Sequence, residues 1–207
     1  MPGGSGTPMR RRRGEPAGWS LVELVMVIGV SLVVGALALA AFAPLSAGAR
    51  AVGAARYLAA LLQRERIEAV RTGRVCGLRF DDDGSTVGFV RVADGNGNGL
   101  RSAEIAGGID PVRGPRVRLA DAFAGVRFAI VDDVPAVDGG PAMLAAGTDP
   151  VRLGSSILAF APTGSATSGT LYLASADGRQ FAVRILGATG RVRTFEFDRA
   201  TARWVPR

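Results

Sequence analysis

Residues 18–23 read Gly18-Trp19-Ser20-Leu21-Val22-Glu23, and an apolar run follows them as far as Ala43. Between Trp19 and Ala43 the only ionisable side chain is that of Glu23. At about 1.5 Å per residue, a helix over 19–43 would be roughly 37 Å long, enough to cross the hydrocarbon core of a bilayer. A carboxylate at the centre of such a span costs about 2.5 to 3.5 kcal/mol, so Glu23 needs an explanation.

The positive charge of the chain is concentrated in front of this apolar run. All 25 basic residues are Arg, and the net charge is +7. Residues 1–18 hold four consecutive Arg, from Arg10 to Arg13, against Glu15, and they show no apolar periodicity. We expect this leader to be disordered. Basic residues before an apolar span follow the positive-inside pattern, which predicts a cytoplasmic N-terminus and a C-terminal domain on the other side of the membrane.

The composition excludes several kinds of site. The chain has no His and a single Cys, Cys76. It therefore lacks the commonest metal ligand, the usual general base and any intrachain disulfide, so we expect no zinc site, no His-dependent triad, no cofactor and no enzymatic activity. Cys76 itself is expected to be a small core residue in a strand.

Two cleavage sites are consistent with the N-terminal region. An ordinary secretory signal is cut after its apolar stretch at small residues, and Ala38, Ala40 and Ala41 could form such a site. The alternative is a cut before the apolar stretch, after Gly18.

The second alternative is supported by a resemblance. Gly18, the aromatic Trp19, Ser20-Leu21-Val22-Glu23 and the apolar run together resemble the class III signal of type IV pilins and pseudopilins. The resemblance implies that a prepilin peptidase cuts between Gly18 and Trp19, methylates the new amine of Trp19, and leaves Glu23 as the fifth residue of the mature chain. Trp19 and Ser20 are conservative departures from the usual Phe and Thr.

This resemblance also accounts for the carboxylate in the apolar run. In a bundle of parallel helices, Glu23 can pair with the terminal amine of a neighbouring subunit, and a charge-assisted pair in a low dielectric is strong although it must offset desolvation. The alternative is a carboxylate at the headgroup level of an ordinary membrane anchor.

The apolar run continues into an amphipathic segment. Pro44 is expected to kink the helix without ending it. Over 44–73, Ala55, Leu58, Leu62 and Ala69 recur at spacings of three, four and seven, and Gly73 provides a stop signal. The mixed Arg and Glu residues of 62–73 are typical of a solvated helix face.

From residue 74 onward the sequence predicts antiparallel strands. Short apolar runs alternate with turn signals such as Asp83-Gly84 and Asp177-Gly178. Residues 132–154 are rich in Gly, Pro, Ala and Asp and are expected to form an exposed excursion between strands. The predicted strands are 75–80, 87–92, 117–119, 126–131, 157–160, 170–174, 180–186 and 191–197.

The rest of the chain resembles the GspH/FimT family of minor pseudopilins and pilins. The resemblance rests on the helix end at 62–73 and on four pieces in the family's order, at 158–164, 169–173, 183–185 and 190–193. It implies an α+β, pilin-like fold in which a long N-terminal helix packs on an antiparallel sheet. The implied organisation is a removed cytoplasmic leader at 1–18, a transmembrane or filament-core helix at 19–43, its amphipathic continuation at 44–73 and a periplasmic β-rich domain at 74–207, in a single-pass protein of the inner membrane.

One loop resembles the start of a calcium site. Asp94, Asn96 and Asn98 place oxygen ligands at alternate positions, and Gly99 is the sixth residue. A calcium loop needs a bidentate Glu at its twelfth position, where this chain has Ile105, with Glu104 one residue early. A turn between strands is the preferred interpretation, with calcium as the alternative.

A second candidate lies near the C-terminus. Strand alternation places Arg191 and Arg193 on one face, where two guanidinium groups can grip phosphates. Gly190, Arg191 and Arg193 also match the Gly-Arg-x-Arg motif through which FimT-like minor pilins bind DNA. Arg184, Arg199, Arg203 and Arg207 could widen this patch, while Glu196 and Asp198 interrupt it. The alternative is a solvated strand face.

Two functions therefore remain for comparison with the structure. The first is a minor pseudopilin of a type II secretion system that assembles through its helix into or at the tip of a periplasmic pseudopilus. Its expected partners are other major and minor pseudopilins or pilins, the prepilin peptidase and inner-membrane lipid. The alternative is a FimT-like type IV minor pilin that binds DNA for uptake.

Overall fold

The computed structural model describes residues 20–84, 86–137 and 142–207, and within the long helix it describes side chains up to residue 36 and again from residue 47. Its contacts divide the chain into one unit that ends at Phe42 and another that runs from Ala43 to Arg207. The leader and the predicted cleavage site at Gly18 and Trp19 lie outside the described residues.

One helix, α1 (Leu21–Thr72), contributes residues to both units. It continues through Pro44, as predicted, and it ends immediately before Gly73. Gly73 has a φ of 66°, which lies in the left-handed region that suits glycine after a helix. In the second unit the buried face of α1 consists of small and aliphatic residues and one carboxylate, namely Ala47, Ala51, Ala54, Ala55, Leu58, Leu61, Leu62, Glu65 and Ala69.

The second unit contains two antiparallel sheets that we call the first and second sheet. The first sheet has the order β3-β2-β1-β8, and the second has the order β12-β11-β10-β9-β4, with β7 also paired to β9. A separate hairpin pairs β5 with β6. The elements are β1 (Cys76–Asp82), β2 (Val87–Ala93), α2 (Ser102–Ala106), β3 (Val117–Arg118), α3 (Leu119–Ala122), β4 (Arg127–Phe128), β5 (Val134–Pro135), β6 (Met143–Leu144), β7 (Val151–Arg152), β8 (Ile157–Phe160), β9 (Gly169–Ala174), β10 (Gln180–Leu186), β11 (Arg191–Asp198) and β12 (Arg203–Pro206).

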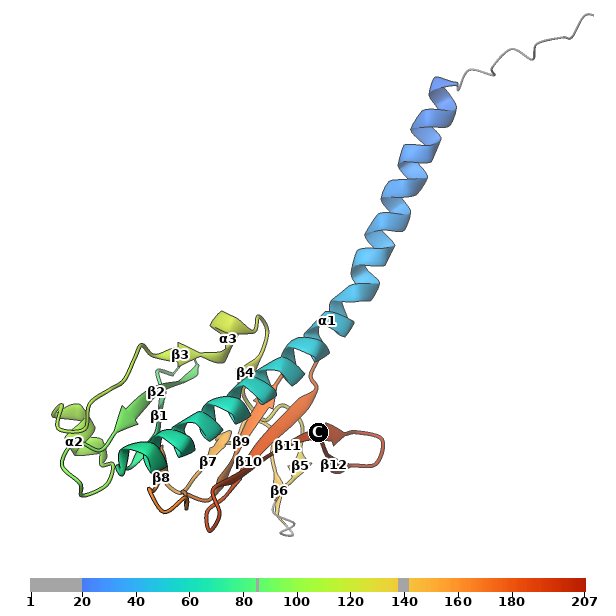
Figure 1. The fold of residues 1–207 in the computed structure, drawn as a ribbon. Coiled ribbons are helices and arrows are strands. Elements are labelled where there is room, and N and C mark those ends of the chain that lie inside the picture. Colours follow the sequence, from blue (N-terminus) through green and yellow to red (C-terminus); the bar gives the residue numbers. More distant parts are fainter. Residues whose placement is uncertain (1–19, 85, 138–141) are drawn as a thin grey trace, which may run out of the picture. The chain divides into compact units, whose positions relative to one another are not determined.

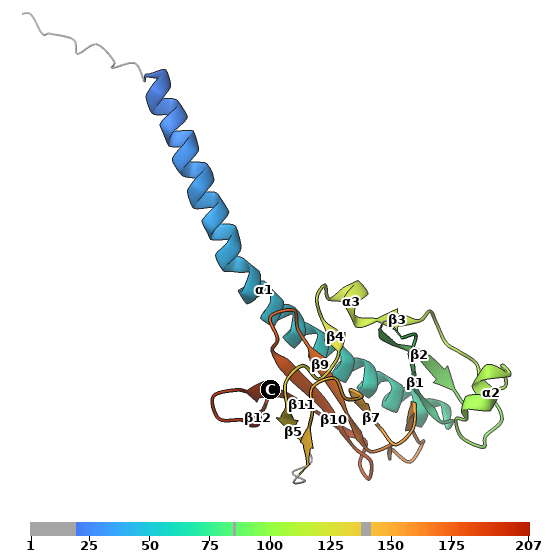
Figure 2. The same ribbon diagram turned by 180° about the vertical axis from the view of Figure 1, so that it is seen from behind.

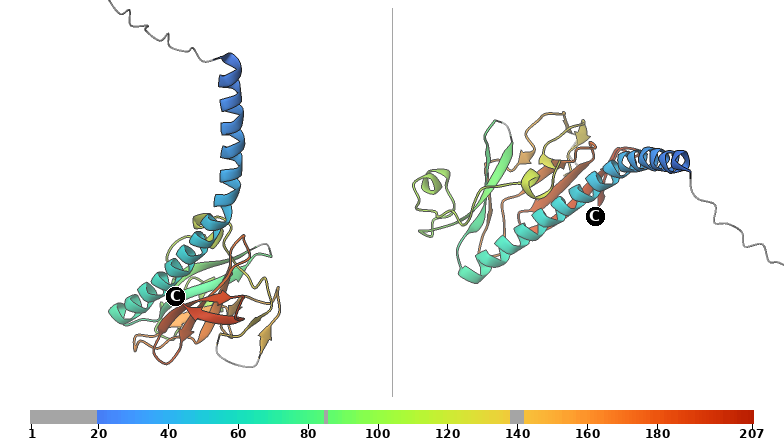
Figure 3. Two further views of the ribbon diagram at one scale, coloured as in Figure 1. Left: turned by 90° about the vertical axis from the view of Figure 1, so that its right-hand side faces the viewer. Right: turned by 90° about the horizontal axis from the view of Figure 1, so that it is seen from above.

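Within this unit both sheets lie against the same side of the second part of α1 (Figures 1 and 2). The view from above shows the helix along one side and the strands on the other (Figure 3). Side chains from α1 and from both sheets join one apolar core, which includes Leu58, Leu78, Phe89 and Phe181. Cys76 is 1 % exposed in this core, which confirms that it is a small core residue. The predicted α+β fold with a long helix packed on antiparallel sheet is therefore observed.

The described parts of the segment 132–154, residues 132–137 and 142–154, contain more regular structure than their composition predicted. They contain β5, β6 and β7, and Val134 and Leu144 are buried against Ile130, Tyr172 and Ala182 on the outer face of the second sheet. The expectation of a merely exposed excursion was wrong because apolar residues are spaced among its glycines and prolines.

The C-terminal strand, β12, packs against the β5–β6 hairpin. Trp204 of β12 packs against Tyr172 and Phe197 with ring centroids 5.7 and 5.2 Å apart. Its indole N–H donates to the carbonyl of Pro135 at 2.7 Å. Trp204 therefore packs over the second, smaller core, formed by Ile130, Val134, Leu144, Tyr172 and Ala182.

A buried carboxylate on α1 ties the helix to the first sheet. Glu65 has no exposed surface, and its two oxygens accept hydrogen bonds from Arg91 Nε and Arg113 Nη2, each at 2.6 Å. Arg91 belongs to β2, Arg113 follows α2, and the backbone N–H of Arg113 donates to the carbonyl of Arg91 at 2.7 Å. The prediction of a solvated Arg and Glu face was wrong at this position.

Replacement of Glu65 should therefore destabilise the second unit strongly. Glu65→Ala leaves two partly buried guanidinium groups facing a vacated site, and breaking a buried ion pair costs about 3 to 5 kcal/mol. The exposed neighbour Arg64→Ala is the control and should change the unfolding free energy by less than about 0.5 kcal/mol. Denaturant unfolding followed by circular dichroism checks both, and equal midpoints for the two variants would contradict this account of the fold.

Candidate functional site

The described part of the first unit begins with a helix cap at Ser20. The hydroxyl oxygen of Ser20 accepts the backbone N–H of Val22 at 3.3 Å, and its carbonyl accepts the N–H of Leu24 at 3.1 Å. Glu23 follows Ser20 by three residues, which is the spacing of a capping box, and a carboxylate in the first turn is stabilised by the helix dipole. Glu23 is therefore the acidic residue in the first turn of α1. The amine predicted to pair with it belongs to Trp19, outside the described residues.

The described side chains of this unit form an exposed apolar surface. Leu21 is 78 % exposed, Val27 47 % and Val34 59 %, and the large apolar residues between them are exposed to a similar degree. A continuous apolar surface of this kind usually marks a site of contact with protein or membrane. In the part of the chain that the structure describes, no helix has the length and apolar character needed to cross a membrane.

A second candidate surface lies on the outer face of the second sheet. Arg191 and Arg193 are both exposed on β11, and the register places Arg193 directly opposite Arg184 of β10. Arg184 is opposite Thr170 of β9, which is in turn opposite Arg152 of β7. Residues in register across a sheet share a face, so these Arg side chains form one basic row. Like charges directly opposite each other destabilise a sheet. A binding role for this row would account for that cost.

The residues expected to widen or interrupt the Arg191 patch are placed differently from the prediction. Glu196 lies on the opposite face of β11, where Arg179 and Arg207 pair with it. Asp198 lies on that same opposite face and accepts the hydroxyl of Thr201 at 2.8 Å.

Of the four Arg residues proposed to widen the patch, only Arg184 joins the row. Arg199 pairs with Asp132 and Arg207 pairs with Glu196, while Arg203 is in register with Asp198, away from the row. Arg152 was missed, because its place in the row depends on β7, a two-residue strand without a sequence signal of its own.

The structure explains why residue 190, the first of the Gly-Arg-x-Arg motif, is a glycine. Its φ is 60°, and a Cβ added there would lie 2.4 Å from the carbonyl oxygen of Gly164. The Nε of Arg66 on α1 donates to that same carbonyl at 3.3 Å. A glycine is therefore required at residue 190, in the turn before β11 that lies close to Gly164 and Arg66. This requirement does not depend on what Arg191 and Arg193 bind.

The loop at 94–99 is a closed turn in the structure. The carboxylate of Asp94 accepts the backbone N–H groups of Asn96, Gly97 and Gly99, at distances from 2.7 to 3.1 Å. The side-chain amides of Asn96 and Asn98 donate to Glu104. Among the described residues no cluster of three or more acidic, His or Cys ligands is placed to hold a metal ion. These contacts favour the turn interpretation over the calcium alternative.

Ionisable groups elsewhere have structural partners. Burial raises the pKa of the Cys76 thiol, which favours the unreactive protonated form. Asp81 and Asp83 both pair with Arg116, at 2.8 and 3.1 Å. A hydrogen bond from Arg71 lowers the pKa of Glu68.

Comparison with known families gives one match. The model of the family described as Type II transport protein GspH matches residues 54–189, which is more than half of the chain. The matched part runs from the second part of α1 to the end of β10 and includes Glu65, but it does not reach Glu23, Arg191 or Arg193. Searches of curated proteins and of solved structures found no match.

Because of the turn at Asp94, the unfolding free energy of the second unit should depend on pH. Burial alone would raise the pKa of Asp94, but the backbone N–H groups of Gly99, Gly97, Asn96 and Asn98 outweigh burial and hold that pKa below its usual value. The stabilisation is therefore complete above about pH 4 and is lost as the pH falls through the lowered pKa. Asp94→Asn should lower the unfolding free energy by about 1 to 3 kcal/mol near pH 7 and by less in acid. The exposed Asp121→Asn is the control, and an Asp94→Asn effect that is the same at both pH values would contradict this role.

Proposed function

The chain belongs to the GspH family of type II transport proteins, and we propose that it is a minor pseudopilin that assembles through the first part of α1 into, or at the tip of, a periplasmic pseudopilus. The family is one of structural pseudopilins, and its members associate with other pseudopilins of the secretion system. The chain contributes to protein export by polymerisation and not by catalysis.

The observation that supports this assembly route is the exposed apolar surface of the first unit. Between residues 20 and 36 the sole ionisable side chain is Glu23, and the large apolar residues are exposed from Leu21 to Val34. Such a surface gains free energy when it is covered, at roughly 25 cal/mol per Å² of apolar area. We propose that inner-membrane lipid covers it before assembly and that the helices of neighbouring subunits cover it in the filament.

Processing and orientation complete the proposal. The prepilin peptidase cuts between Gly18 and Trp19, and Arg10 to Arg13 hold the leader in the cytoplasm until then. The second unit lies in the periplasm. In the filament the carboxylate of Glu23 pairs with the methylated amine of Trp19 in an adjacent subunit, which fixes the axial register of the two helices.

Glu23→Gln tests this mechanism while preserving side-chain shape. Removing the charge leaves the neighbouring amine without its partner in a low dielectric, and this costs several kcal/mol. We expect unchanged membrane insertion and processing but a loss of at least about tenfold in pseudopilus-associated subunit and in secretion. Asp121→Asn, at an exposed position of α3, is the control with the same charge change. Normal secretion by the Glu23→Gln variant would refute the register mechanism.

The basic row supports a second candidate function, DNA binding for uptake by a type IV minor pilin. Arg191 and Arg193 are exposed on one face of β11, with Arg184 beside them, and no ion pair involves these three among the described residues. Binding to phosphates would release counterions, so affinity must fall steeply with salt. This candidate requires that neutralising Arg191 and Arg193 together abolishes oligonucleotide binding.

A further inference from the structure

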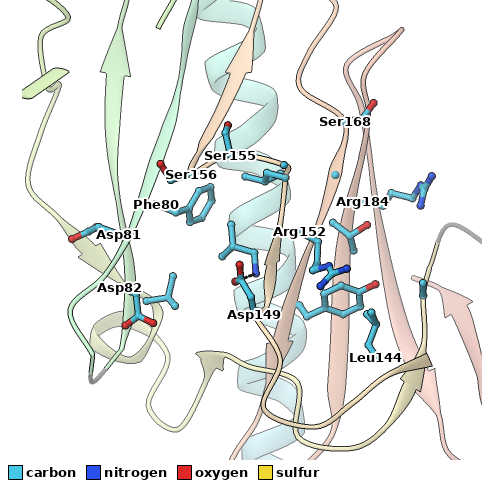
Figure 4. A pocket seen from close by; sticks show the side chains of 18 of the residues that line it. Phe80, Asp81, Asp82, Leu144, Asp149, Arg152, Ser155, Ser156, Ser168 and Arg184 are labelled. Carbon is cyan, nitrogen blue, oxygen red and sulfur yellow. Dashed lines mark hydrogen bonds between the residues drawn. The ribbon is translucent and has the colours of Figure 1, made fainter. Parts of the chain in front are cut away.

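A hollow of about 1040 Å³ lies between the two sheets, but the main chain that borders it is already bonded. Figure 4 shows Phe80, Ser156 and Asp149 among the residues that line it. The N–H of Phe80 donates to the carbonyl of Ser156 at 2.8 Å, and the N–H of Val151 donates to the carboxylate of Asp149 at 2.8 Å. These main-chain groups are therefore not available to a ligand.

A second hollow, of about 470 Å³, differs in this respect. It lies between Ala59 of α1 and residues 191–194 of β11, and we call it the β11 hollow. β12 pairs with β11 only from Phe195 to Asp198, so the first half of β11 continues beyond β12. The N–H of Arg207 donates to the carbonyl of Thr194 at 3.0 Å, which extends the pairing by one residue. Before Thr194, no described strand pairs with β11 on this side.

Val192 presents its main chain to the β11 hollow. The hydrogen-bonding groups of successive residues in a strand alternate between its two sides, and the carbonyl of Thr194 faces the side of β12. The N–H and carbonyl of Val192, two residues earlier, therefore face that side too, and neither has a bond there among the described residues. An open strand edge with a free donor and acceptor binds extended polypeptide by adding a strand.

The side chains around the β11 hollow are positively charged. Arg191, Arg193 and Arg207 line it, and none of the described residues that line it is acidic. Arg191 and Arg193 are exposed and have no ion pair in the described part of the chain, whereas Arg207 pairs with Glu196. Acidic side chains in the occupant would complement this charge, and charge-assisted hydrogen bonds to guanidinium groups are strong.

The two faces of β11 set the order of side chains in the occupant. Residues opposite each other in paired strands place their side chains on the same face. Residues opposite Arg191 and Arg193 would lie on the outer face, where carboxylates meet the two guanidinium groups. The residue opposite Val192 would lie on the inner face beside Ala59, where Val192 packs against the apolar core. The arrangement therefore favours a triplet of an acidic, a small apolar and an acidic residue.

We propose that the β11 hollow binds an extended segment of a partner protein that contains this triplet and pairs antiparallel with β11 at Val192, in line with β12. A polypeptide is favoured over nucleic acid because a phosphodiester has no donor for the carbonyl of Val192. The inference goes beyond the proposed assembly function, because it concerns the second unit and does not depend on Glu23 or on the first part of α1.

The test uses the full chain in detergent and fluorescently labelled five-residue peptides with blocked ends. The probe is Thr-Glu-Val-Glu-Thr, and fluorescence anisotropy should show it binding more tightly than Thr-Gln-Val-Gln-Thr. A methyl group on the main-chain nitrogen of the probe's Val removes the donor to the carbonyl of Val192 and should weaken binding at least tenfold. The same methyl group on the first Glu, whose N–H points away from β11, should change binding by less than about twofold.

Variants of the chain test the same contacts from the other side. Arg191→Gln/Arg193→Gln should weaken probe binding by about fivefold to tenfold, because it removes two exposed ion pairs. Val192→Pro removes the N–H that faces the hollow and should weaken binding at least tenfold, since proline is tolerated where a strand's N–H faces solvent. Arg50→Gln/Arg64→Gln, with both residues exposed on α1, is the matched charge control and should leave binding unchanged. Circular dichroism checks that each variant keeps the fold.

The inference is overturned if the probe does not bind at millimolar concentration, if the two methylated peptides bind equally, or if the charge control weakens binding as much as Arg191→Gln/Arg193→Gln. A single-stranded oligonucleotide separates this site from the DNA-binding candidate. Val192→Pro should leave any oligonucleotide binding unchanged. An oligonucleotide that binds more tightly than the probe and displaces it would overturn the inference and support the DNA-binding candidate.

Discussion

The second unit depends on the neutralisation of one buried carboxylate. Glu65 lies within the apolar stripe of α1, and a buried charge is tolerated only when its partners are close and well oriented. Arg91 and Arg113 meet that requirement from β2 and from the segment after α2, so one side chain ties the helix to two parts of the chain far away in sequence. The contact fixes how the first sheet sits on α1. β1 in turn pairs with β2 along its whole length.

Much of the fold could be predicted because its signals are local. Gly73 marks the end of α1, and the strands at 157–160 and 180–186 have the predicted bounds. Features that depend on tertiary contacts were missed. Glu65 looks like part of a solvated face by composition, although it falls three residues after Leu62 and four before Ala69, which is the signal that could have placed it on the buried face. β7 and β12 are short strands that exist because β9 and β11 offer them an edge.

For the candidate surfaces, too, features set by local sequence were predicted and features set by contacts between strands were missed. Alternation within β11 was enough to place Arg191 and Arg193 on one face. Glu196 was wrongly expected to interrupt them, because the same alternation puts it on the other face. Which other arginines join them depends on register between strands, and register brought in Arg184 and Arg152 while Arg199 and Arg207 were taken up by carboxylates elsewhere.

The central claim is that α1 has two roles, as part of a fixed core in the second unit and as an assembly surface in the first. A photo-reactive benzophenone side chain in place of Val30, which is 55 % exposed, tests it most directly in cells that express the whole secretion system. The account predicts cross-links to the helix of another pseudopilin, identified by mass spectrometry, while the same group at exposed Thr201 gives none to those helices. Efficient processing with cross-links to lipid alone, and none to another subunit, would contradict the claim.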